Sequence, residues 1–139
     1  MGARPHHRLS ARLRSQRGAA AVEFALVVPL LLLLLFSIVS VSRAFQVQGT
    51  VSAAAREAAR SMALTNDEAT ARAAAVFAAS TSKVTLSSSQ VAISPSTCTG
   101  AAPTTNITVT ITVDFQPTGS YAGGIAFPIT SKAVVRCGG

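Results

Sequence analysis

The sequence predicts an α+β fold in which a long N-terminal transmembrane helix continues into a small domain with a short second helix and an antiparallel sheet of three or four strands. Three observations support this prediction. Residues 24–42 form a run of 19 residues without a charge. Apolar residues then recur at helical spacing from Val51 to Met62, and they alternate strictly with polar residues from Ile107 to Phe115.

The N-terminal segment, residues 1–18, is strongly basic. The chain of 139 residues has a net charge of +7, and this segment holds five of the basic residues and no acid: Arg4, Arg8, Arg12, Arg14 and Arg17. Hydrophobic residues make up 49% of the chain and charged residues 12%, which is unusually apolar for a small soluble domain. Because the basic segment lacks interleaved aromatic residues and precedes an apolar run, it indicates a topology signal, and no direct contact with nucleic acid is predicted.

The uncharged run is long enough to cross a membrane. A helix of 19 residues at about 1.5 Å per residue extends about 28 Å, close to the hydrocarbon thickness of a bilayer. Since short basic segments stay in the cytoplasm, we expect a single pass with the N-terminus cytoplasmic and the C-terminal domain outside. Two simpler interpretations stay open: a plain signal anchor, and a secretory signal cleaved after Ser42, with Ser40 and Ser42 at positions −3 and −1.

Glu23 lies at the start of the apolar stretch. A carboxylate at a membrane boundary is costly without a partner, so it is a functional candidate, although it can also extend to the headgroups. The string Gly18-Ala19-Ala20-Ala21-Val22-Glu23-Phe24, with a basic leader before it and a leucine-rich helix after it, resembles the processing site of type IV pilins. The Glu-Phe pair and the following Ala25-Leu26-Val27-Val28-Pro29-Leu30 resemble the TadE-like pseudopilins of the tight-adherence (Tad/Flp) branch.

This resemblance implies a processing and assembly mechanism. A prepilin peptidase would cut after Gly18, and Glu23, followed by Phe24, would pair during assembly with the new α-amine of Ala19 on a neighbouring subunit. Pro29 removes a backbone donor inside the helix, which predicts a kink unless neighbours compensate. The implied organisation is a leader (1–18), a transmembrane and assembly helix (19–43) and an extracytoplasmic pilin-like domain (44–139).

The resemblance also implies a function and partners. The chain would be a minor subunit of a tight-adherence pilus or secretion system in the bacterial inner membrane, supporting pilus biogenesis and adhesion. Its partners would be the prepilin peptidase, the major pilin, other pseudopilins, the inner-membrane platform proteins and membrane lipid. The alternative is a signal-anchored or secreted envelope domain unrelated to pili.

Two helical segments are expected in the outer domain. The first carries a mostly alanine stripe that continues from the membrane helix: Val51, Ala54, Ala55, Ala58, Ala59 and Met62. Thr65 and Glu68 match a capping box, which predicts Thr65 as the N-cap of a second helix extending to about Ser80. The apolar face expected for that helix comprises Ala69, Ala73, Val76 and Phe77.

The remaining chain predicts strands. Val84–Ile93 is one strand candidate, and residues 94–105, with Pro95, Gly100 and Pro103, form a loop. Ile107–Phe115 is the clearest strand, ended by Pro117 and Gly119. A turn at Gly123-Gly124 leads to one or two returning strands at Ile125–Phe127 and Lys132–Cys137, with Pro128 marking a break or an edge.

The two cysteines and the missing histidines limit the chemistry. Cys98 and Cys137 are predicted to form a disulfide, which agrees with an exported domain; separate thiols or a metal pair are the alternatives. Both histidines, His6 and His7, precede Gly18, so no Ser-His or Cys-His nucleophile and no metal-ligand set can be assembled outside the membrane. The sequence therefore predicts neither an enzyme nor a bound cofactor or metal.

Overall fold

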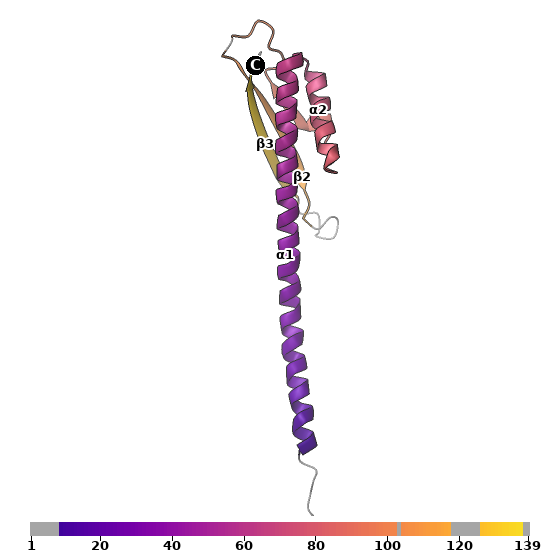
Figure 1. Cartoon of the computed structure of the whole chain (residues 1–139). Helices are drawn as coiled ribbons and strands as arrows, with labels where there is room; N and C mark the ends of the chain where they lie inside the picture. The colour runs from indigo at the N-terminus through magenta and orange to yellow at the C-terminus, as the bar shows by residue number, and fades with distance from the viewer. Residues whose placement is uncertain (1–8, 103, 118–125, 138–139) are drawn as a thin grey trace, which may run out of the picture. The chain divides into compact units, whose positions relative to one another are not determined.

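The computed structural model describes the backbone of residues 9–102, 104–117 and 126–137, with side chains from residue 18 onward. The chain divides into two compact units, Met1–Val39 and Ser40–Gly139. Helix α1 (Leu9–Thr65) forms the described part of the first unit and extends into the second. The second unit adds these elements, shown in Figure 1: α2 (Glu68–Thr81), the 3-10 turn η1 (Ser88–Gln90), β1 (Val91–Ser94), β2 (Asn106–Phe115) and β3 (Phe127–Arg136). The predicted α+β class is confirmed.

The three strands form one antiparallel sheet in the order β1-β2-β3. Burial alternates along β2 as its sequence predicts, with four inward residues: Ile107, Val109, Ile111 and Val113. On the other face, Thr112 of β2 pairs with Thr130 of β3, and their hydroxyl oxygens lie 3.1 Å apart. The sheet therefore has one face toward the core and one polar face.

The core of the second unit combines the C-terminal part of α1 with α2 and the sheet. All six residues of the predicted α1 stripe are buried: Val51, Ala54, Ala55, Ala58, Ala59 and Met62. Alanine loses no side-chain rotamer entropy on burial, and its small size allows the helix backbone to approach its neighbours closely. Met62 is the largest of the fully buried side chains in the described part of this core.

The corner between α1 and α2 differs from the predicted capping box. Thr65 is the last residue of α1, and Asn66 follows with φ of 52°, a left-handed conformation that asparagine tolerates at helix ends. Asp67 is the N-cap of α2, since its carboxylate accepts hydrogen bonds from the backbone N–H groups of Ala69 and Thr70 and from the Thr70 hydroxyl. These bonds, the hydroxyl of Thr70 first, lower the pKa of Asp67, whose side chain is exposed.

The predicted apolar face of α2 was wrong. The buried residues are Ala71, Ala75 and Ala79, whereas Ala69 and Ala73 are exposed and Phe77 is 73% exposed. Val76 is half-buried. Alanine occupies both faces of this helix, so its sequence pattern does not distinguish the buried face from the exposed one.

The strand predicted to begin at Val84 begins instead at Val91. The residues directly before it form η1, where the Ser87 backbone N–H donates to the Gln90 side-chain oxygen at 2.8 Å. Local bonds between side chains and backbone of this kind compete with strand pairing. At the C-terminus, β3 is one strand that includes Pro128, opposite Asp114. β3 is an edge strand of the described sheet, where the missing N–H of proline is tolerated. The predicted features at Pro103, Gly119, Gly123-Gly124 and Ile125 lie outside the described residues.

Candidate functional site

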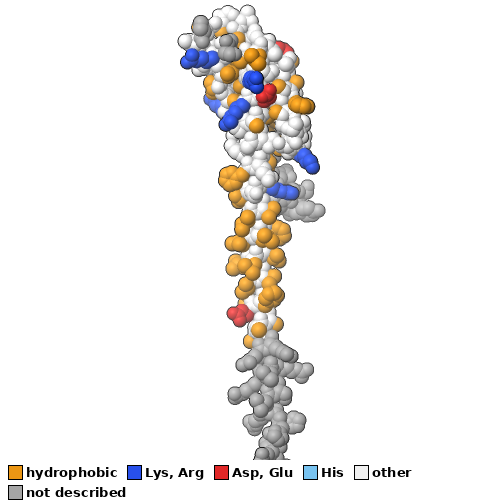
Figure 2. All heavy atoms as spheres, viewed as in Figure 1, with side chains coloured by type: hydrophobic (Ala, Val, Ile, Leu, Met, Phe, Trp, Pro, Cys, Tyr) orange, Lys and Arg blue, Asp and Glu red, His pale blue; other side chains and the backbone are white. Residues whose placement is uncertain are grey.

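The apolar part of α1 in the first unit is exposed along nearly all of its described length, with Val28 half-buried. Phe24 is 70% exposed and Leu26 is 74% exposed, and the other large apolar residues of this segment are similarly open. Figure 2 shows hydrophobic side chains covering the visible face of this part of the chain. The stretch is long and apolar enough to cross a membrane, and none of its apolar window is buried by the residues that the structure describes. This surface is a candidate membrane anchor, because so much apolar area requires a partner or a bilayer.

The predicted processing and assembly residues all lie on this helix. Gly18 is helical, and a Cβ added there would meet no atom within 4 Å. Ala19 and Glu23 are four residues apart, so they lie on the same side of α1, and both are exposed. Among the residues with described side chains, the one ion pair is that of Arg72 with Glu68, at 2.5 Å. Glu23 therefore has its carboxylate open to a group outside the described part of the chain.

Pro29 lies inside α1, and the helix continues without a break on both sides of it. Its side chain is exposed, as is that of Phe24. The arginines of the predicted leader are outside the described side chains, so the structure adds nothing on their contacts.

A disulfide joins Cys98 and Cys137 in the second unit, with the Cα atoms 5.6 Å apart. It links the loop before β2 to the residue that follows β3. The same loop is held to the corner between the helices, because the Asn66 side-chain oxygen accepts the Cys98 backbone N–H at 2.5 Å and its amide donates to the Thr99 hydroxyl at 2.7 Å. The disulfide thus stabilises a junction of three segments rather than a free loop.

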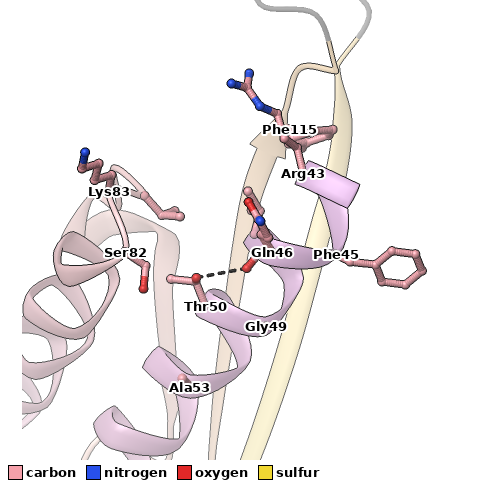
Figure 3. A pocket seen from close by; sticks show the side chains of 11 residues that line it. Arg43, Phe45, Gln46, Gly49, Thr50, Ala53, Ser82, Lys83 and Phe115 are labelled. Atoms are coloured by element: carbon pink, nitrogen blue, oxygen red, sulfur yellow. Dashed lines mark hydrogen bonds between the residues drawn. The ribbon is translucent and has the colours of Figure 1, made fainter. Parts of the chain in front are cut away.

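A groove of about 840 Å³ in the second unit was not predicted from the sequence. It lies between α1, the turn that follows α2 and the end of β2 (Figure 3), and its lining includes Arg43, Phe45, Gly49, Ala53, Lys83 and Phe115. These residues come from three segments that are distant in the sequence. The sequence alone offered only two separate basic residues, Arg43 directly after the uncharged run and Lys83 shortly after the predicted second helix, and nothing to bring them together.

Residues 18–60 match the family described as TadE-like protein. The matched segment begins at Gly18 and includes Glu23, the whole apolar run and most of the α1 stripe, so the resemblance stated for this part of the sequence is confirmed. No curated protein and no solved structure matches the chain.

Proposed function

We propose that this chain is a minor pseudopilin of a tight-adherence pilus or secretion apparatus, cut after Gly18 by a prepilin peptidase and held in the bacterial inner membrane by residues 24–42. One observation carries the proposal. The match to the TadE-like family covers residues 18–60, and the same stretch contains an apolar helix that no other described residue buries. The residues that match the family therefore include the exposed apolar surface of α1.

Cleavage after Gly18 would change the electrostatics of the helix end. It would create the α-amine of Ala19, which has an ordinary pKa of about 7.7–8.0 and is therefore largely protonated at neutral pH. Glu23, four residues later, would have its carboxylate near the positive end of the shortened helix. In an assembling polymer the carboxylate of one copy pairs with the amine of the next, and each charge reduces the desolvation cost of the other at the membrane boundary. Glu23 then sets the axial position of an incoming subunit.

The match to the TadE-like family supports a structural role for the chain in this apparatus. Of the acidic residues of the second unit with described side chains, Glu57, Asp67 and Asp114 are exposed, whereas Glu68 is half-buried and pairs with Arg72. The partners of such a subunit are the prepilin peptidase, the major pilin, other pseudopilins and the membrane platform proteins. The basic leader supports a cytoplasmic N-terminus, and the disulfide supports a second unit outside the cytoplasm.

Intact mass and N-terminal sequencing of the membrane-extracted protein test the proposal, in strains with and without the prepilin peptidase. We expect a mature N-terminus at Ala19 that disappears in the strain lacking the peptidase. A start at Arg43 would identify a secreted domain instead, and an uncut chain in both strains would leave a signal anchor. Either of these results contradicts the proposed processing.

A pair of variants tests the proposed role of Glu23 separately. Glu23→Gln removes the charge but keeps the size, so we expect normal cleavage at Gly18 together with loss of pilus assembly. Glu57→Gln is the matched control, because Glu57 is an exposed carboxylate of α1 in the second unit. Equal assembly by both variants and by the unmodified protein would contradict the pairing of Glu23 with the amine.

A further inference from the structure

The groove of the second unit has a charge pattern that the assembly function does not use. Two cations line it, Arg43 on α1 and Lys83 on the turn after α2, and no acidic residue is among its described lining residues. Neither cation forms an ion pair within the described part of the chain. Asp114 is the neighbour of the groove residue Phe115, but successive side chains of a strand point to opposite faces. The groove is therefore suited to an anion.

The walls of the groove are largely apolar. Phe45 is 73% exposed, and Phe115, Val47 and Val84 are half-buried. Small residues of α1, among them Gly49, leave the space open between the helix and the turn. A ligand that fits this lining has a negative group for the cations and an apolar part for the walls.

Lys83 occupies an unfavourable backbone position. Its φ is 58°, in the left-handed region where glycine is preferred at the end of a helix. The backbone there closes α2, since the Lys83 N–H donates to the Ser80 carbonyl at 3.0 Å and the Val84 N–H to the Ala79 carbonyl at 3.2 Å. In Figure 3 Lys83 lies on the opposite side of the groove from Arg43. A glycine at this position would relieve the strain of the left-handed backbone, so the lysine side chain is not required to close the helix.

We propose that Arg43 and Lys83 bind the phosphate of an anionic phospholipid headgroup, with the apolar walls of the groove against the upper part of the lipid. The position of the groove along the chain identifies this ligand. Arg43 directly follows Ser42, the last residue of the uncharged run, so it meets the headgroup layer where α1 leaves the bilayer. This inference rests on the membrane anchoring of residues 24–42 in the proposed function. The turn after α2 then contacts the membrane surface as well.

Native mass spectrometry of the full chain in detergent tests the site, with phosphatidylglycerol and phosphatidylcholine offered in equal amounts. We expect the chain to retain phosphatidylglycerol preferentially. Arg43→Gln and Lys83→Gln should each reduce the preference about fivefold, because a basic residue near an anionic surface contributes about 1 kcal/mol. The double variant Arg56→Gln/Arg60→Gln is the matched control, since it removes two exposed cations of α1 outside the groove and should keep the preference.

A second substitution separates binding from folding. Lys83→Gly removes the ammonium and relieves the left-handed strain, so we expect a higher Tm together with the same loss of lipid preference as Lys83→Gln. The site is overturned if the Arg56→Gln/Arg60→Gln control loses as much preference as the groove variants, or if Lys83→Gly retains phosphatidylglycerol like the unmodified chain. It is also overturned if soluble glycerophosphoglycerol competes as well as the lipid, since the ligand is then a free phosphate. Extraction of the chain from membranes by alkaline carbonate would contradict the anchoring itself, whereas an anchored chain without lipid preference contradicts the headgroup site alone.

Discussion

Removing the disulfide is expected to cost the second unit much of its stability. Cys98 and Cys137 are 39 residues apart in the sequence. In the chain-entropy description, closing a loop of this length lowers the entropy of the unfolded chain by about 13 cal/mol/K, which corresponds to about 4 kcal/mol at 25 °C. Domains of this size have a total free energy of unfolding of about 5–15 kcal/mol. The double substitution Cys98→Ala/Cys137→Ala should therefore remove between a quarter and most of that stability.

The structure indicates which contacts the loss of the disulfide would weaken first. The Cys98 backbone N–H is bound by the Asn66 side chain, so a loop released at Cys98 also weakens the corner between α1 and α2. Pulse proteolysis of the full chain in detergent, at increasing urea concentrations, measures the free energy of unfolding of the exposed unit. For a domain of this size, a loss of about 4 kcal/mol corresponds to a decrease in Tm of roughly 15–30 °C.

The control for this experiment is the unmodified chain after reduction with dithiothreitol, which breaks the same bond without a substitution. Both samples should lose the same amount of stability relative to the oxidised chain. A loss below about 1 kcal/mol in both would refute the argument from loop closure, because the unfolded chain would then gain little freedom from the open bond. A loss confined to the double variant would assign the effect to the new side chains.

Three further predictions concern the packing and capping of the second unit. Met62→Ala should lower the free energy of unfolding by about 2–5 kcal/mol, since it leaves a cavity at the position of the largest fully buried side chain. Urea titration measures this free energy, and a change below about 1 kcal/mol would contradict the described packing. Ala58→Leu should destabilise by about 1–3 kcal/mol through overpacking, whereas Ala73→Leu on the exposed face of α2 should leave the Tm nearly unchanged. Asp67→Ala should lower the Tm at neutral pH. Since the pKa of Asp67 is lower in the folded state than its ordinary 3.8, the ionised cap stabilises above that value and its contribution is lost as the pH falls through the folded pKa, so the difference between the two proteins should vanish in strong acid.

The elements with a strong repeating pattern could be predicted from the sequence. The α1 stripe from Val51 to Met62 and the alternation along β2 both have one clearly apolar face, and burial follows the pattern residue by residue. In α2 the pattern was misleading because alanine stands on both faces and the large side chain, Phe77, is on the exposed one. The N-cap was displaced from Thr65 to Asp67 because α1 extends farther than the capping motif implies.

The two candidate sites also differ in how far the sequence alone predicts them. The segment from Gly18 to Pro29 is continuous, so its motif and its apolar surface can be recognised from consecutive residues. The groove combines Arg43 of α1 with Lys83 and Phe115, which meet through the packing of α1, the turn after α2 and β2. A site of this kind cannot be recognised from a local sequence pattern. Residues far apart in the sequence meet only through the tertiary packing, which the spacing between them does not reveal.

The composition of β3 affects how copies of this unit can meet one another. An edge strand offers unpaired backbone groups to any other strand, and a protein held at high density in a membrane would risk aggregation through such an edge. β3 carries Pro128, which has no N–H to donate, and two exposed cations, Lys132 and Arg136, that repel the same strand of a second copy. Joining of sheets edge to edge is thereby disfavoured at β3, which leaves the shorter edge strand β1 as the edge of the described sheet without these protections.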